Sequence, residues 1–522
     1  MSNRLHLPKI QFNSWRYAII KRVEQKLANC KTYKFNNILS KKANKEALEH
    51  LKQDFVLAPV DKAANNVALI CKAYYMSVLT AEIKESPTFA MVPGNEQNIF
   101  DNISNSGYIN TADKLRLPML YATCKMHKNP KDFRYITAGR DTVLQNLSIC
   151  VAKCLKKLLK VANTYDQYKI KELDNCIFII DNRDKVVKFL NKANASQENK
   201  KKCISSWDFS TLYTKIPHCQ LKDNVKTFVN NVFKSMATKG KNGKTKDKKD
   251  IKNYICCSVN SKHAYFSRTK SKTNVCYTKE TLVSAIEYII DNSYITFQDI
   301  IYRQIVGIPM GTNCAPYLAN IYLHVFEYNY LSLLVSKGQI DIANKLCNIY
   351  RFQDDCISIN DSNVFKDHYM HMYPPEMILK PTNISRDKCT FLDLTISIYR
   401  GKFMYYSYDK RRDFDFNVVS YPNLCGNIPT AQSYGVFTSQ LVRFCDINQH
   451  SKHFKIDVGD MSHKFLAQGF NIDSLRSKYR DFCSRYMYKW AKFNDNIAHG
   501  TVIDKIFPCS TTSHTHHITL NM

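Results

Sequence analysis

Residues 349–359 read Ile-Tyr-Arg-Phe-Gln-Asp-Asp-Cys-Ile-Ser-Ile, and the architecture of the chain can be inferred from this segment. Two adjacent carboxylates, Asp354 and Asp355, lie between two short runs that are rich in β-branched and aromatic residues. This pattern predicts a β-hairpin whose tight turn carries both carboxylates. Because Asp is a favoured turn residue, an Asp-Asp pair alone is also typical of ordinary turn structure.

A third carboxylate, Asp208, ends an apolar, strand-like run that begins at Cys203. Two strands that each end in Asp can bring their carboxylates together, and converging carboxylates repel one another unless a divalent cation neutralises them. Mg²⁺ suits such a site because it binds one or two carboxylates and completes its shell with water and substrate phosphates. Two such ions can hold the attacking and leaving oxygens of a phosphoryl transfer, which predicts the palm of a polymerase.

Several segments of the chain agree with this interpretation. Residues 352–355 resemble the Tyr-x-Asp-Asp motif of reverse transcriptases, and residues 207–218 (WDFSTLYTKIPH) resemble the preceding catalytic motif of the Penelope-like retroelement group. Further matches to that group follow in the expected order at residues 59–66, 117–134, 307–316, 391–394 and 433–444. The resemblance covers about residues 54 to 446, and the ordered set is far more specific than any one motif. It implies the reverse transcriptase of a retroelement.

The resemblance implies an α/β (α+β) right-hand polymerase fold with an antiparallel-sheet palm, fingers and a helical thumb. The expected regions are a basic N-terminal extension (1–53), fingers (54–200), a palm (201–408) with a Lys-rich insertion near 234–252, and a thumb with a C-terminal tail (409–522). Phe391–Ile398 and Phe403–Tyr408 flank a turn and predict a further hairpin. The resemblance assigns this hairpin to the primer terminus.

A basic segment, Leu117–Arg134, precedes the palm motifs. Its cations suit the charge that develops on a triphosphate, although a solvated basic loop has the same composition. By resemblance, Arg134 holds the phosphates of the incoming nucleotide together with a lysine, and the sequence does not decide between Lys125 and Lys128. The resemblance also gives Tyr213 the position of the aromatic residue that crowds the sugar 2′ carbon and so selects deoxynucleotides.

The resemblance implies two Mg²⁺ ions, with Mn²⁺ as an alternative. Asp208 and Asp354 are the expected direct ligands, with Asp355 orienting or ligating, and the backbone carbonyl of Phe209 is expected to complete one shell. Gly311 lets the backbone approach a ligand closely, in a motif that the family uses to hold template and nucleotide. Three departures from the family pattern remove side-chain hydrogen bonds that are usual there: Met310, Ala315 and Phe352.

The chain is strongly basic, with 75 Lys plus Arg against 45 Asp plus Glu and a formal net charge of +30. This excess predicts a polyanionic partner and binding that weakens as salt rises. The partners that the resemblance implies are an RNA template, a DNA primer, their RNA-DNA hybrid and deoxynucleoside triphosphates. A separate endonuclease is a further expected partner, since the endonuclease pattern that many Penelope-like elements carry is missing.

The sequence contains no apolar stretch of membrane-spanning length and no secretory signal, so we expect a soluble, intracellular protein without a membrane partner. The basic cluster Lys246–Lys252 is compatible with nuclear import and equally with a solvated loop, which leaves nucleus and cytoplasm both open.

Nineteen cysteines could indicate disulfides or zinc. No pair of Cys-x-x-Cys units occurs, however, and many cysteines lie inside apolar runs, so we expect buried free thiols. Examples are Cys150, Cys154 and Cys356. The tail carries Cys509, His514, His516 and His517. These residues could bind a metal ion, but chance composition is the better explanation of their clustering.

Two other functions fit part of the sequence. A domesticated or inactive element product could keep the fold and only bind nucleic acid, and the three departures from the family pattern favour this alternative mildly. The intact Asp208, Asp354 and Asp355 argue against it. A viral RNA-directed RNA polymerase would have to admit a 2′ hydroxyl, which the bulky Tyr213 disfavours.

Overall fold

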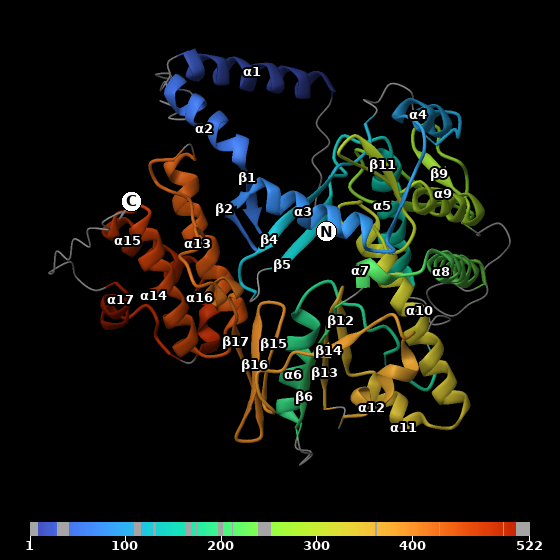
Figure 1. Ribbon diagram of the computed structural model, residues 1–522. Coiled ribbons are helices and arrows are strands. Elements are labelled where there is room, and N and C mark those ends of the chain that lie inside the picture. Colours follow the sequence, from blue (N-terminus) through green and yellow to red (C-terminus); the bar gives the residue numbers. More distant parts are fainter. Residues whose placement is uncertain are drawn as a thin grey trace. The chain divides into compact units, whose positions relative to one another are not determined.

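The computed structural model describes most of the chain (Figure 1). The described residues are 9–28, 41–108, 116–128, 132–162, 170–173, 175–196, 202–210, 212–238, 252–360, 363–426, 428–493 and 495–507. The chain divides into two compact units, residues 1–55 and residues 56–522. The tail cluster from Cys509 to His517 and most of the Lys-rich insertion lie outside the described residues.

The first unit contains two helices, α1 (Lys9–Ala28) and α2 (Lys42–Asp54). No residue of α2 is buried, and residues 13–25 of α1 are all exposed. Since helices in folded domains normally bury one apolar face, neither helix provides a core of its own within this unit.

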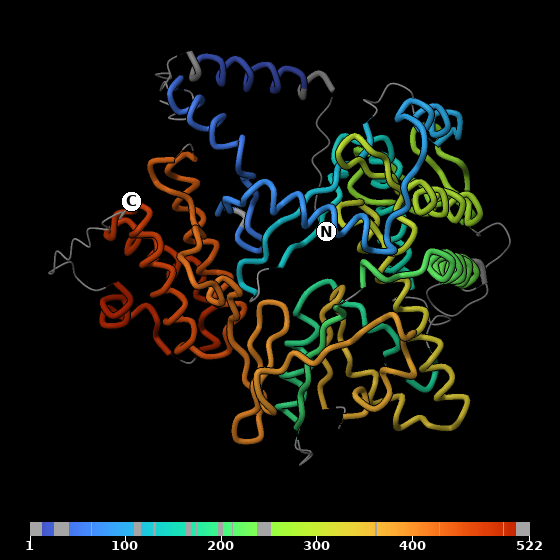
Figure 2. The backbone as a smooth tube through the Cα atoms, viewed as in Figure 1, coloured from blue at the N-terminus to red at the C-terminus, as the bar shows by residue number. Residues whose placement is uncertain are grey.

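An antiparallel four-stranded sheet in the second unit is the predicted palm. Its strand order is β12 (Ile349–Phe352), β13 (Asp355–Ile359), β6 (Ile204–Phe209) and β14 (Leu379–Pro381). The predicted hairpin is confirmed, but only Asp354 of the two carboxylates lies in its turn, with Gln353, whereas Asp355 pairs with Phe352 as the first residue of β13. The colours of Figure 2 show that β6 lies beside strands from much later in the chain.

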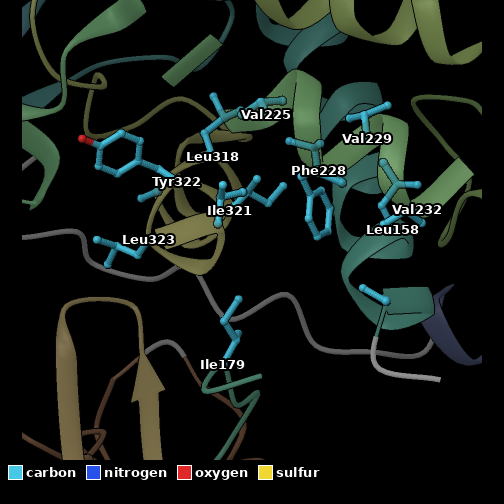
Figure 3. Packing of buried hydrophobic residues seen from close by; sticks show 14 of the residues in the cluster. Leu158, Ile179, Val225, Phe228, Val229, Val232, Leu318, Ile321, Tyr322 and Leu323 are labelled. Atoms are coloured by element: carbon cyan, nitrogen blue, oxygen red, sulfur yellow. The ribbon is translucent and has the colours of Figure 1, made fainter. Parts of the chain in front are cut away.

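A group of helices packs beside the palm and supplies a large buried cluster. These helices are α5 (Gln145–Ala162), α7 (Leu212–Lys215), α8 (His218–Thr238), α9 (Lys279–Asp291), α10 (Ala315–Ser336), α11 (Ile340–Leu346) and α12 (Val364–Met372). Figure 3 shows Phe228 and Val229 of α8 close to Ile321 of α10 and Leu158 of α5. Pro316 lies in the first turn of α10, where its missing N–H leaves no helical hydrogen bond unmade.

A second four-stranded sheet forms the predicted fingers, in the order β2 (Ala63–Cys71), β1 (Phe55–Val60), β4 (Leu120–Lys125) and β5 (Asp132–Thr137). Helix α3 (Lys72–Lys84) packs against this sheet through Tyr75, Leu79 and Ile83, which share a buried cluster with Phe133. The neighbouring elements are α4 (Glu96–Ser104) and a three-stranded sheet of β10 (Tyr294–Phe297), β11 (Ile300–Gln304) and β3 (Phe89–Met91).

A small sheet follows the Lys-rich insertion, in the order β8 (Tyr265–Ser267), β7 (Tyr254–Cys257) and β9 (Val275–Tyr277). Cys256 and Cys276 are cross-strand partners in β7 and β9, and they form a disulfide. The prediction of free thiols is therefore wrong for this pair, because strand register and not sequence spacing brings the two cysteines together. The other cysteines among the described residues are free, and most of them are buried.

The second predicted hairpin is formed by β16 (Leu394–Tyr399) and β17 (Lys402–Ser407), and β16 also pairs with β15 (Lys388–Phe391) on its other side. Its first strand begins later than predicted. Leu392 has a φ of 55° and makes a turn with Asp393, so Phe391 belongs to β15 instead of to the hairpin. Helix α6 (Asp184–Ala195) packs against β17, where the amide of Asn194 donates to the Phe403 carbonyl at 2.8 Å.

The C-terminal region is helical, as predicted for a thumb. It contains η4 (Lys410–Asp413), α13 (Thr430–Ile447), α14 (Ser451–Ala467), α15 (Ile472–Arg485), α16 (Met487–Trp490), η5 (Ala491–Phe493) and α17 (Gly500–Ile506). The longer helices of this region share a buried cluster with β15, β16 and β17. Within the described ranges, no helix has the length and apolar character needed to cross a membrane.

Candidate active site

Three carboxylates come together at the tip of the palm hairpin. Asp208 of β6 and Asp355 of β13 are direct partners in the antiparallel ladder. Asp354 lies in the adjoining turn, where its carbonyl oxygen accepts a hydrogen bond from the Phe209 N–H at 3.0 Å. All three residues line one cleft with a volume of about 670 Å³. Because like charges at directly opposed strand positions are destabilising, folding alone does not favour this arrangement.

Burial and mutual repulsion raise the pKa of two of these carboxyls. Burial is the main cause at Asp208, and the charge of Asp354 adds to it. At Asp355 burial, supported by the charges of Asp354 and Asp208, raises the pKa to about 6, although Lys410 acts in the opposite direction. A bound cation would favour the ionised form of each carboxyl and so reverse both shifts.

Whether these carboxylates fit a metal ion depends on the donors that they offer. In the part of the chain that the structure describes, no three or more His, Cys, Asp and Glu side chains form a ready metal-binding group. The three Asp residues nevertheless provide hard oxygen donors that face one cleft. Mg²⁺ needs only one or two carboxylates when a phosphate-bearing substrate and water supply its other ligands, so the donor set fits this ion.

Cationic side chains line the same cleft, and they include both lysines between which the sequence did not decide. Arg134 Nε lies 3.0 Å from a carboxylate oxygen of Asp61, and Lys125 Nζ lies 2.7 Å from one of Asp132. Lys128 makes no ion pair with any described residue, and its charge acts on Asp208. The cleft-lining cations are Lys62, Lys125, Lys128, Arg134, Lys215 and Lys410.

Three of these cations, Lys62, Lys215 and Lys410, are not among the site residues that the sequence predicts. Lys62 lies in the turn between β1 and β2 with a φ of 64°, and Lys410 begins η4. Burial lowers the pKa of Lys62, and the charge of Lys410 lowers it further. Crowded cations of this kind are stabilised by an anion with several charges, such as a triphosphate. The only sequence signals for Lys62 and Lys410 are the motif around Asp61 and the basic run after the palm.

Tyr213 and Phe209 lie in the cleft with the carboxylates. Helix α7 carries Tyr213, whose hydroxyl donates a hydrogen bond to Gln353 Oε1 at 2.9 Å. The buried ring of Phe209 packs edge-on against Tyr373, with 4.9 Å between the ring centroids. Both residues predicted on resemblance are therefore placed beside the predicted acids.

Gly311 has a different environment from the one predicted. Its φ is 133°, and a Cβ atom at this position would come within 1.9 Å of the Thr137 carbonyl oxygen. The preceding Met310 carbonyl accepts a hydrogen bond from the Thr137 N–H at 2.7 Å. The close approach that Gly311 permits is thus to strand β5, and Met310, not Gly311, lines the cleft.

A buried charged residue that the sequence did not indicate supports the hairpin. Arg351 of β12 is fully buried, and its guanidinium contacts both carboxylate oxygens of Glu327 on α10, at 2.6 and 3.2 Å. It also donates to Asn320 Oδ1 at 2.7 Å and to the carbonyl of the turn residue Gln353 at 3.2 Å. The turn that carries Asp354 is therefore fixed to a long core helix.

Comparisons with known proteins bear on the fold. No protein-family model matches the sequence. No curated protein matches it either. A structure of telomerase from Candida albicans in complex with the TWJ fragment of telomeric RNA matches with a TM-score of 0.55 and 12% identity, over 90% of this chain and 75% of that chain. A structure of apo telomerase from Candida tropicalis matches with a TM-score of 0.47 and 10% identity, over 89% and 73% of the two chains.

The Candida albicans match extends over 90% of this chain and shows its fold. The chain has the right-hand fold of a nucleic-acid polymerase, with an antiparallel palm, fingers and a helical thumb. The three carboxylates lie on the palm strands β6 and β13 and in the turn before β13. At 12% identity the match defines the fold and not the activity.

Proposed function

We propose that the protein is an RNA-directed DNA polymerase of a Penelope-like retroelement. The reaction is the template-directed attack of a primer 3′ hydroxyl on the α-phosphate of a deoxynucleoside triphosphate, with release of pyrophosphate. One observation carries this proposal: Asp208, Asp354 and Asp355 share a single cleft with six cationic side chains on a right-hand polymerase fold. Such a cleft can bind a triphosphate and polarise it at the same time.

The acidic end of the cleft would hold the metal ions. Asp208 and Asp354 are proposed to ligate two Mg²⁺ ions, for which Mn²⁺ could substitute, with Asp355 supporting them. Bound there, the ions would make the 3′ hydroxyl of the primer more acidic and neutralise charge on the transferred phosphoryl group. The Phe209 N–H donates to the backbone carbonyl of Asp354, which ties the hairpin turn to β6.

The basic residues would act on the triphosphate. Lys128 is available for a phosphate oxygen, whereas Arg134 and Lys125 would have to exchange Asp61 and Asp132 for the substrate. Lys62 and Lys410 bring charge close to the carboxylates. Once Arg134 and Lys125 have exchanged these partners, the cationic groups would together stabilise the charge that develops on pyrophosphate.

The specificity rests on two further proposals. The ring of Tyr213 would occupy the space that a 2′ hydroxyl needs, so the enzyme would prefer deoxynucleotides. The RNA template, the retroelement origin and a separately supplied endonuclease follow from the motif resemblance. An A-form hybrid is recognised mainly through its shape and backbone, for which the basic chain is suited.

Primer extension by the purified protein tests the proposal. The assay uses an RNA template, a DNA primer and Mg²⁺, and compares deoxynucleotides with ribonucleotides. We expect extension with deoxynucleotides and its loss in Asp354→Ala. The matched control is Asp341→Ala, which removes an exposed carboxylate from α11 and should extend normally.

Other results would point to other functions. Extension with ribonucleotides at equal efficiency would support an RNA polymerase. Salt-sensitive binding of primer-template without any extension, unchanged by Asp354→Ala, would overturn the proposal in favour of a protein that only binds nucleic acid.

A further inference from the structure

The hydroxyl of Tyr213 has a defined partner in the cleft. It donates to Gln353 Oε1 at 2.9 Å, although the two residues are 140 positions apart. Burial raises the pKa of the Tyr213 hydroxyl, and the charge of Asp354 raises it further. The hydroxyl therefore stays protonated at neutral pH and keeps the proton that it donates to Gln353.

Gln353 is itself held in place. It is the first residue of the hairpin turn and has a φ of 58°. Its carbonyl oxygen accepts a hydrogen bond from the guanidinium of Arg351 at 3.2 Å, and Arg351 is fully buried against Glu327. Gln353 accepts the hydrogen bond of Tyr213 through its side chain, and its backbone is held by Arg351 of the buried ion pair.

We propose that Gln353 is a positioning residue for sugar selection, which fixes the ring of Tyr213 through its hydroxyl and so sets the space left for a 2′ substituent. The inference rests on the proposed function, because it assumes that Tyr213 faces the sugar of a bound nucleotide. It goes further by assigning a role to the residue between Phe352 and Asp354 in the palm motif.

The physical basis is the freedom of an aromatic side chain. A Tyr ring without a hydrogen-bond partner can change its rotamer and its depth in a cleft at little cost. A neutral hydrogen bond contributes about a factor of five in equilibrium terms. Without this hydrogen bond, the Tyr213 ring should leave its position for part of the time and make room for a 2′ hydroxyl. Discrimination between deoxynucleotides and ribonucleotides should then fall by about the same factor of five, although the ring itself is still present.

Four proteins test the inference: wild type, Gln353→Met, Tyr213→Phe and the double variant. The readout is the ratio of kcat/KM for a deoxynucleotide to that for the matching ribonucleotide. We expect each single variant to lower this ratio about fivefold and the double variant to lower it no further, since both substitutions remove the same hydrogen bond. Gln353→Glu keeps an acceptor and should preserve the ratio even where its charge slows both reactions.

A second measurement uses binding instead of chemistry. Affinities of a deoxynucleotide and a ribonucleotide for the complex with a dideoxy-terminated primer should show the same loss of discrimination in Tyr213→Phe. An unchanged ratio in Tyr213→Phe and Gln353→Met, or losses that multiply in the double variant, would overturn the role of Gln353 while leaving the polymerase activity established. A wild-type protein that neither incorporates nor binds nucleotides would instead remove the proposed function, and the inference with it.

Discussion

Asp355 occupies a position that its own charge disfavours. It is partly buried, faces Asp208 across the β6–β13 ladder and follows Asp354 directly. These neighbours and the burial raise its pKa from 3.8 to about 6. Since the folded state binds this proton more tightly than the unfolded chain does, the carboxyl favours folding below about pH 4. That contribution is lost as the pH rises through about 6.

The substitution Asp355→Asn is therefore expected to stabilise the protein at pH 7.5 in the absence of divalent cations, by roughly 2 kcal/mol. Thermal unfolding measures the change as a higher Tm than that of wild type. At pH 4 the difference should be small, because the native carboxyl is then protonated. Asp341→Asn serves as the control and should leave Tm unchanged at both pH values. A stability difference that does not depend on pH would contradict the assigned cause.

A sequence pattern identifies a site residue only where a residue of suitable chemistry stands at a recognisable place in a motif or a secondary-structure element. Asp208, Asp354 and Asp355 could be predicted because each stands at the end of a strand-like run in an ordered set of motifs. Lys62 and Lys410 could not, because they reach the carboxylates only through the packing of segments that are far apart in the chain. Gly311 was predicted at a ligand, whereas tertiary packing places it against Thr137.

At the scale of elements, the palm hairpin is joined to helix α10 through a buried ion pair. Arg351 and Glu327 are both fully buried, and Tyr373 donates a further hydrogen bond to Glu327 at 2.9 Å. Removing one partner of such a pair leaves an uncompensated charge in the core, which costs more than the pair itself contributes.

Arg351→Met is accordingly expected to destabilise the protein by roughly 3–5 kcal/mol. The double variant Arg351→Met/Glu327→Leu should recover much of this loss, because it removes both charges. Urea unfolding monitored by circular dichroism gives the comparison. Lys52→Met, which breaks an exposed ion pair with Glu49, should change stability by less than about 0.5 kcal/mol. A double variant as unstable as Arg351→Met would show that packing, not charge, holds the hairpin.

The elements themselves were largely predictable. Two short runs rich in β-branched and aromatic residues predicted the palm hairpin, and the turn between β16 and β17 predicted that strand pair. Register was not predictable, because it depends on which strands become neighbours. For this reason the turn at Leu392 and the disulfide between Cys256 and Cys276 appear only in the folded protein.

At the scale of the whole molecule, the net charge of +30 dominates. It predicts that binding of primer-template weakens steeply with salt, by about a thousandfold between roughly 50 and 200 mM if several phosphates are contacted. Fluorescence anisotropy over a series of NaCl concentrations measures the slope. Asp341→Ala should show the wild-type slope. A nearly flat dependence would mean that the excess charge is not directed at nucleic acid.

The opposed pair Asp208 and Asp355 also has an evolutionary consequence. Because each acid lowers the stability of the free protein, a gene copy released from selection for DNA synthesis would gain stability by losing either of them. Mutation would then erode the pair sooner than it erodes the surrounding core. On the proposed function, we therefore expect these two codons to be among the first to change in degenerate copies of the gene.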